Sequence, residues 1–514
     1  MKKIIALLLA VAMMACLFAG CNNSNNNDPS KSTQGTTDSK NNDTSESTQD
    51  TTDSKNNDEI VELTWYQVGS GMPANYDAWK ANLDAYLEEK IGVHLNVVVV
   101  GWGDWDSRRN VVVGTNEPYD IMFTNNGSYA KDVETGSFLD ITDLVKTAAP
   151  NLYSYIPEDY WKACEINGRV YAVPTYKDSS LTNFFVYDED MAIDSGADYK
   201  NAHDFKSADA VVAAMYEVYQ QPVTINAQGG TDVLGNLYDG LGLGLTGLGV
   251  SYYDTDAPTV VPVFEQEDAM NNLRILHSWY VKGYTNSDAA ILAENPTYRP
   301  FYVAQGWPSA AKTSWGNAES AYTGELINAV AVQVGDTVLS NDTVQGSLSC
   351  ISASCKYPEK ALQLLELVNT DSYVRDALYY GLEGDNFDYV EVDGEQRVHK
   401  NNTDWTMAGY TQGTFFNVTQ LDTDEFNQWI EVQAQNEEAI ASPCLGIYID
   451  TSSFADDLAA CQAIWATYKP QIWTGVGDPD ALVPQMMAEY RDSGFDEILA
   501  EVQRQVDEWY NAQG

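Results

Sequence analysis

From residue 60 onward, apolar positions along the chain recur with regular periods. Residues 62–66 alternate between polar and apolar side chains and predict a strand, residues 94–100 form the apolar run of a buried strand, and residues 119–124 predict a third strand. Over residues 76–86, apolar side chains recur at intervals of three and four, which predicts one face of a helix that Asn75 can cap. This order of strands and helices predicts a parallel sheet that is covered on both faces.

The C-terminal residues predict one more amphipathic helix. Over residues 495–509, apolar side chains recur at intervals of four and three. We expect this helix to dock onto the body, with a coiled-coil partner face as the alternative.

The N-terminal residues follow a different pattern. Lys2 and Lys3 precede an apolar run over residues 4–20, and Cys21 follows directly. A basic start, a short apolar run and small residues before the cut are typical of a secretory signal peptide. Residues 22–58 are almost entirely polar and contain one twelve-residue unit twice with a single change. We expect this segment to be a disordered tether, because it has too little apolar surface to offset its ordering entropy.

Composition excludes one class of partner. The chain carries 75 acidic and 28 basic residues, a formal net charge of −47. Phosphate backbones repel such a surface, so we expect no nucleic-acid partner. Hydrophobic residues make up 44% of the chain, which is enough for packed domains despite the acidity. No second apolar stretch is long enough to cross a membrane.

The sequence offers no motif for catalysis, metal or cofactor binding. The five cysteines after Cys21 are irregularly spaced, with a bridge between Cys350 and Cys355 as an open alternative to free thiols. The four histidines lack metal-ligand spacing, and there is no Gly-x-Ser-x-Gly elbow. Glycines at 242, 244 and 247 match a dinucleotide fingerprint by spelling, but no clear strand precedes them. We therefore expect neither a cofactor nor an enzyme.

Five segments of the ordered region resemble family 1 extracellular solute-binding proteins, the receptor subunits of bacterial ABC sugar importers. They are residues 118–126, 136–144, 166–174, 356–361 and 478–512. The stretch Asn-Gly-Arg-Val-Tyr-Ala-Val-Pro within residues 166–174 is the most distinctive of them. The last segment resembles a C-terminal extension of uncharacterised role found in Gram-positive lipoprotein members.

Residues 17–21 resemble the lipobox of bacterial lipoproteins, with Phe18 where leucine is usual. That resemblance implies cleavage before Cys21 and attachment of a diacylglyceryl group to its thiol. An uncleaved membrane helix and an ordinary secretory signal are the alternatives.

The family resemblance implies an α/β fold, the two-lobed periplasmic-binding-protein-like fold (type II), with a ligand cleft between the lobes. Closure requires a few backbone positions that absorb the change of angle. Residues 171–177 and 330–346 are the candidates, with a third crossing between about 405 and 445. The implied boundaries are a lipoprotein signal peptide at 1–20, a lipidated cysteine and tether at 21–58, lobe 1 at 59–174, lobe 2 at 175–335, a return segment of lobe 1 at 336–420, and a C-terminal segment packed on lobe 2 at 421–514.

A sugar presents apolar C–H faces and a rim of hydroxyls, so it needs aromatic platforms and fixed polar groups. Such groups near the ends of the predicted strands are the first candidates, because ligands of parallel sheets bind there. In the family, stacking aromatics lie on the second lobe. Core packing, turn formation or a surface ion pair is the alternative for each candidate. The candidate ligand-binding residues are Tyr66, Gln67, Trp102, Asp104, Asn125, Asn126, Tyr176, Lys177, Asp178, Trp307 and Trp315.

The sequence therefore predicts a monomeric receptor, lipid-anchored at Cys21 on the extracellular face of the plasma membrane. It would capture an oligosaccharide by hinge closure and deliver it to ABC permease subunits. The ligand is expected to be neutral, since few Lys or Arg residues lie near the cleft segments. The alternatives are a secreted glycan-active enzyme and a peptide-binding receptor or scaffold.

Overall fold

The computed structural model describes residues 60–513, except 116, 227–232, 235, 256, 295, 297, 311–318 and 321–323. The predicted signal peptide, the lipidated Cys21, the tether and the candidate ligand residue Trp315 lie outside the described residues. Within the part of the chain that is described, no helix combines the length and the apolarity needed to cross a bilayer.

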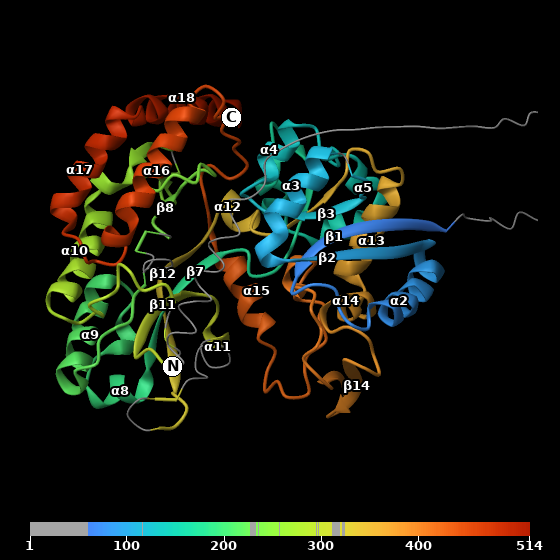
Figure 1. Ribbon diagram of the computed structural model, residues 1–514, viewed down its shortest axis with the longest axis horizontal. Coiled ribbons are helices and arrows are strands. Elements are labelled where there is room, and N and C mark those ends of the chain that lie inside the picture. Colours follow the sequence, from blue (N-terminus) through green and yellow to red (C-terminus); the bar gives the residue numbers. More distant parts are fainter. Residues whose placement is uncertain are drawn as a thin grey trace, which may run out of the picture. The chain divides into compact units, whose positions relative to one another are not determined.

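The three predicted strands belong to the first sheet (Figure 1). Its strand order is β2 (Val93–Gly101), β1 (Val61–Gly69), β3 (Ile121–Thr124), β13 (Leu348–Ile351) and β6 (Ala172–Pro174). β1 lies parallel to both β2 and β3, in register with β2 from Val61↔Val93 to Gly69↔Gly101. The prediction of parallel strands is confirmed for these three, but it is wrong for the whole sheet, because β13 runs antiparallel to both of its neighbours.

Amphipathic helices complete the core of this first sheet. α2 (Tyr76–Ile91) buries Trp79, Leu83 and Leu87 and ends at Gly92, whose φ of 66° suits glycine. Each such apolar side chain contributes about 1.5–3 kcal/mol when fully buried. The predicted capping of this helix by the side chain of Asn75 is wrong, because the Asn75 amide donates to Asp385 and Asn386 instead.

A second sheet has its own core. Its order is β11 (Phe301–Gln305), β7 (Leu181–Asp188), β12 (Ala329–Leu339) and β16 (Ile440–Ala441). α9 (Phe205–Tyr219) and α10 (Glu267–Val281) contribute to this core, together with the C-terminal helices α16 (Ala455–Ile472), α17 (Pro479–Asp492) and α18 (Phe495–Gln513). In α18, Phe495, Ile498, Val502 and Val506 are buried there, which confirms that this amphipathic helix docks onto the body.

The chain passes between the two sheets three times. β6 and β7 belong to different sheets, as do β12 and β13, so residues 175–180 and 340–347 are passes. The third leads from Met407, buried in the first core, to β16 in the second sheet. Each pass lies within or next to a segment that the sequence indicated as a crossing.

Further helices and strands complete the two cores or surround them. They are α3 (Trp105–Thr115), α4 (Tyr129–Glu134), α5 (Leu144–Ala148), α6 (Pro150–Tyr155), α7 (Glu158–Ala163), α8 (Glu189–Asp194), α11 (Pro308–Ala310), α12 (Asn341–Val344), α13 (Pro358–Thr370), α14 (Ser372–Tyr379), α15 (Trp429–Glu438), β4 (Glu165–Ile166), β5 (Arg169–Val170), β8 (Tyr238–Asp239), β9 (Leu248–Ser251), β10 (Val260–Pro262), β14 (Phe387–Val392) and β15 (Glu395–Lys400), with single 3-10 turns at η2 (Trp102–Asp104), η3 (Tyr199–Asn201), η4 (Val263–Glu265) and η6 (Gly409–Thr411).

Candidate functional site

A cavity of about 580 Å³ lies where two of the three passes meet the second sheet. Three of the predicted ligand residues line it, Lys177, Asp178 and Trp307. The first two come from the first pass, whereas Trp307 follows β11 directly. The other lining residues are Leu181, Gln305, Gly306, Ala310, Asp342, Thr343 and Gly346.

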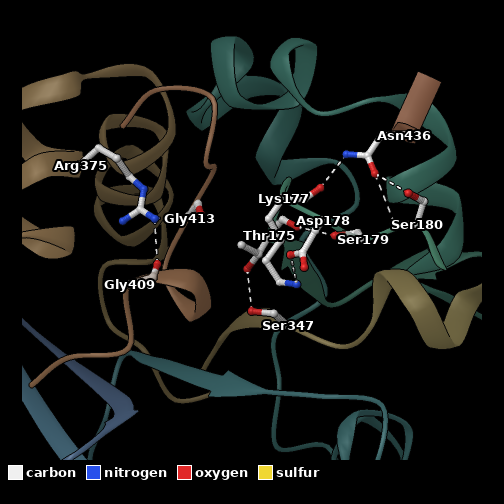
Figure 2. A network of polar contacts seen from close by, with 10 residues as sticks. All are labelled: Thr175, Lys177, Asp178, Ser179, Ser180, Ser347, Arg375, Gly409, Gly413 and Asn436. Atoms are coloured by element: carbon white, nitrogen blue, oxygen red, sulfur yellow. Dashed lines mark hydrogen bonds and ion pairs between the residues drawn. The ribbon is translucent and has the colours of Figure 1, made fainter. Parts of the chain in front are cut away.

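Hydrogen bonds fix the backbone of the first pass beside this cavity (Figure 2). The hydroxyls of Thr175 and Ser347, on two different passes, are 2.9 Å apart. The amide of Asn436, in α15, donates to the carbonyl of Lys177 at 2.6 Å and accepts from the backbone N–H and the hydroxyl of Ser180 at 3.2 and 2.9 Å. Asn436 thus ties the third pass to the first, a role that its local sequence did not reveal.

Lys177 and Asp178 form an ion pair at the cavity wall. The Lys177 ammonium lies 2.8 Å from a carboxylate oxygen of Asp178, and the two side chains are 15% and 31% exposed. Because the pair carries no net charge, it offers donors and acceptors without attracting a charged ligand. Among the described residues of the wall, Asp342 is the other ionisable side chain, and burial raises its pKa.

The indole of Trp307 is held by α15. Its Nε1–H donates to the Gln428 side chain at 3.1 Å, and its ring lies 5.7 Å from that of Trp429. Phe415 stacks on Trp429 at 4.3 Å. The orientation of the Trp307 ring beside the cavity is therefore set before any ligand arrives, as a stacking platform requires.

Trp102 lies at a second aromatic position, immediately after β2. It is 49% exposed, and its ring is nearly parallel to that of Tyr410, with centroids 6.0 Å apart and an interplanar angle of 7°. Tyr410 is 45% exposed, and burial followed by the charge of Asp178 raises its pKa. Asp104 is exposed in the same 3-10 turn as Trp102. The sequence did not indicate Tyr410 as a candidate, because candidates were expected at the ends of predicted strands and no strand directly precedes Tyr410.

Arg375 holds the loop that carries Tyr410 in place (Figure 2). This guanidinium is fully buried and donates to the carbonyls of Thr414, Gly409 and Gly413 at 2.7, 2.8 and 3.3 Å. Burial lowers the pKa of Arg375 to about 10. A buried cation whose Nε and Nη2 donate to three carbonyls fixes a loop that has no regular secondary structure beyond one 3-10 turn, although its Nη1 has no hydrogen-bond partner among the described residues.

Two predicted residues of β1 lie in the protein interior. The Tyr66 hydroxyl donates to the Glu117 carboxylate at 3.0 Å and accepts from Arg108 at 2.9 Å. Gln67 is fully buried, and its side-chain oxygen accepts from the Thr411 hydroxyl at 2.9 Å. Neither residue is among the described residues that line the 580 Å³ cavity.

The other predicted residues also lie outside the 580 Å³ cavity. Asn125 forms a turn by accepting from the N–H of Gly127 at 3.1 Å. Asn126 donates to the carboxylate of Asp342 at 3.3 Å and lines a separate cavity of about 270 Å³. Tyr176 is buried against three neighbouring aromatic rings.

The described cysteines are free thiols. Cys350 is buried in β13 and Cys355 is half-buried, and no disulfide joins them, so the alternative of a bridge is wrong. Burial raises the pKa of Cys355 to about 12, which leaves its thiol unreactive at neutral pH. Among the described residues, no group of three His, Cys, Asp or Glu side chains is placed to hold a metal ion.

The buried Asp239 is expected to make stability depend on pH. Burial raises its pKa from 3.8 to about 6, although it accepts from Ser442 at 2.5 Å and from the N–H of Leu241 at 2.9 Å. The folded chain therefore binds this proton more tightly than the unfolded chain, and stability falls as the pH rises from about 4 to about 6. Asp239→Asn keeps an acceptor without the charge. In urea titrations, we expect the free energy of unfolding of this variant to exceed that of the wild type by about 2 kcal/mol at pH 7.5 and to equal it at pH 4. A variant that is less stable at both values would contradict this account.

The two sheets, the passes between them and the cavity at their junction define a two-lobed solute-binding fold of type II. Residues 81–381 match the family described as bacterial extracellular solute-binding protein. This is more than half of the chain, and the protein belongs to that family, as its sequence motifs predicted. Residues 443–511 match a second description, Domain of unknown function (DUF3502), which overlaps the predicted C-terminal extension and begins earlier.

Similar proteins extend over nearly the whole chain. A carbohydrate ABC transporter substrate-binding protein of Streptococcus pneumoniae serotype 4 is 28% identical over 458 residues, which are 86% of this chain and 90% of the relative. The crystal structure of the N-glycan transport solute binding protein NgtS from S. pneumoniae is 24% identical with a TM-score of 0.75, covering 88% of this chain and all of that one. NgtS structures in complex with Man1GlcNAc and Man5GlcNAc give TM-scores of 0.69 and 0.66. Both are 24% identical to this chain, and each match covers 88% of this chain and 99% of the NgtS chain. These structures confirm the predicted fold class.

Proposed function

We propose that this protein is the carbohydrate receptor of an ABC importer, and that its ligand is a neutral oligosaccharide. The observation that carries the proposal is the 580 Å³ cavity at the junction of the passes, with the ring of Trp307 and the Lys177–Asp178 pair on its wall. A ring face suits the C–H face of a sugar, and a neutral ion pair suits its hydroxyls. The printed name of the S. pneumoniae relative supports the same class of ligand.

Capture by hinge closure follows from the same arrangement. We infer that lobe 1 comprises residues 59–174 and 336–420, and that residues 175–335 form lobe 2 with the C-terminal segment 421–514 packed on it. The hydrogen bonds of Thr175, Ser347 and Asn436 join the three passes near the cavity, which makes this junction a candidate pivot. A sugar that contacts both lobes would favour the closed form, and the closed form would dock on the permease.

The proposed ligand class can be tested with the purified full-length chain in detergent. We expect Man1GlcNAc and Man5GlcNAc, the ligands named in the NgtS complexes, to bind in calorimetry and to raise the melting temperature. Chromatography should recover both sugars intact. An acidic sugar that binds while these two do not would contradict a neutral ligand, and cleavage of either sugar would make the protein an enzyme. Binding of a peptide alone would favour the peptide-receptor alternative.

We also infer that Cys21 carries a lipid anchor on the extracellular face of the membrane. Two acyl chains give far longer-lived attachment than one, at about 0.8 kcal/mol per buried methylene. Cys21→Ala should therefore move the protein from the membrane fraction to the medium, as followed by immunoblotting. Cys355→Ala is the control and should leave it on the membrane. A Cys21→Ala chain that stays in the membrane would instead favour an uncleaved membrane helix.

A further inference from the structure

We propose that Tyr410 and Trp102 form an outer sugar subsite beside the cavity, which makes the receptor prefer long oligosaccharides to short ones. The inference rests on the proposed function, and it adds a preference for the length of the oligosaccharide. Tyr410 contributes half of the subsite and is supplied by the third pass.

The first argument is the exposure of this aromatic pair. Trp102 and Tyr410 are 49% and 45% exposed, although each is large and apolar enough to bury most of its surface. The two rings stack nearly parallel, with an interplanar angle of 7° and centroids 6.0 Å apart, and about half of each residue stays open to solvent. Exposed patches of large apolar side chains mark binding surfaces. Flat rings without charge suit the C–H face of a sugar unit.

The second argument is that this pair adjoins the cavity. The backbone N–H of Phe415, just beyond the loop of Tyr410, donates to the carbonyl of Tyr176 at 3.3 Å, and Tyr176 directly precedes Lys177 on the cavity wall. Burial raises the pKa of the Tyr410 hydroxyl, and the charge of Asp178, on the same wall, adds to this shift. One ligand held in the cavity can therefore extend past Asp178 onto the aromatic pair.

The third argument is that hydrogen bonds hold the loop that carries Tyr410 in one conformation. Arg375 holds three of its carbonyls, and the buried Gln67 accepts from Thr411, the residue after Tyr410. Upstream, Ser70 donates its N–H to the carbonyl of Thr406 at 2.8 Å, at the end of β1. Fixing an aromatic ring before binding lowers the entropic cost of stacking a ligand on it.

A close approach of backbones makes the same loop depend on a glycine. A β-carbon at Gly69 would collide with the carbonyl oxygen of Thr406, so this position of β1 has room only for glycine. The third pass therefore runs against β1, and it brings Tyr410 to Trp102, which follows the neighbouring strand β2.

The acidic side chain beside the aromatic pair limits the charge of the sugar unit that can bind there. Asp104 is exposed in the same turn as Trp102. Its carboxylate accepts hydrogen bonds from sugar hydroxyls and repels acidic sugars, whereas the charge of Asp178 is balanced by Lys177. The subsite therefore takes a neutral sugar unit that is linked to the unit in the cavity.

Calorimetry with Man1GlcNAc and Man5GlcNAc tests the outer subsite. Tyr410→Ala and Trp102→Ala should each weaken Man5GlcNAc binding about tenfold and change Man1GlcNAc binding by less than about twofold. Tyr410→Phe keeps the ring and should bind both sugars like the wild type. Tyr357→Ala, which removes an aromatic side chain of similar exposure at the start of α13, is the matched control.

Two results would overturn the inference while leaving the proposed function in place. They are an equal loss of affinity for both sugars, and no loss for either, in variants that melt like the wild type. If the wild-type chain binds neither sugar, the proposed ligand class fails first, and the outer subsite fails with it.

Discussion

Replacing Trp307 by alanine is expected to weaken sugar binding by about 2 kcal/mol or more, roughly thirtyfold in Kd. The ring lines the 580 Å³ cavity and is held by the Gln428 side chain and by Trp429. Its removal takes away both the stacking face and the shape of the wall, whereas the hydrogen bonds of the passes remain. Calorimetry with Man1GlcNAc measures the effect.

The matched control for this prediction is Trp509→Ala. Trp509 is a partly buried tryptophan in α18, and the Lys162 ammonium lies over its ring at 5.7 Å from the centroid. It is not among the described residues that line the cavity. We expect its loss to leave the affinity unchanged. If Trp307→Ala folds normally and binds the sugar like the wild type, the cavity is not the ligand site.

Replacing Arg375 by alanine should cost about 3 kcal/mol or more of unfolding free energy. The substitution removes an unfavourable buried charge, but it also leaves the carbonyls of Gly409, Gly413 and Thr414 without their donor. Each buried carbonyl that loses its partner costs about 1–3 kcal/mol. Three such losses outweigh the relief from desolvation, and the empty space adds a cavity cost.

Urea unfolding followed by circular dichroism measures this loss of stability. Arg375→Lys should also be destabilised, because an ammonium cannot reproduce the fork that reaches three carbonyls. Arg504→Ala is the control, since this side chain is 52% exposed and, among the described residues, pairs with Glu501 and Glu508, so we expect no measurable loss of stability. A stable Arg375→Ala chain would mean that the loop is fixed by its other contacts.

Local patterns in the sequence predicted the elements well, because burial of one face imposes a period. The apolar spacing over residues 76–86 and over 495–509 matched α2 and α18, and the strands β1, β2 and β3 appeared in the predicted order. The antiparallel β13 was not predicted, because the direction of a strand that arrives from more than two hundred residues away leaves no local pattern. Asn75 failed as a cap for the same reason, since its partners Asp385 and Asn386 lie in a distant segment.

The candidate site shows the same division. Strand ends and loop tryptophans led to Trp102 and Trp307, and the end of a crossing led to Lys177 and Asp178. Tyr66 was also chosen as a strand-end residue, but its side chain lies among core residues, because successive side chains of a strand point to opposite faces. The sequence alone did not indicate which of the strand-end side chains would face the cavity.

By itself, the sequence determined the family through its motifs, and it determined the helices, the strands and the residue types suited to a sugar through periodicity and composition, which are local properties. Only the tertiary structure decided that Tyr410 meets Trp102, that Arg375 holds the loop that carries Tyr410, that Asn436 joins two passes, and that β13 runs antiparallel. These pairings join residues from 34 to more than three hundred positions apart, and they form only when the chain closes long loops during folding. The cavity wall is therefore set by long-range contacts rather than by local patterns.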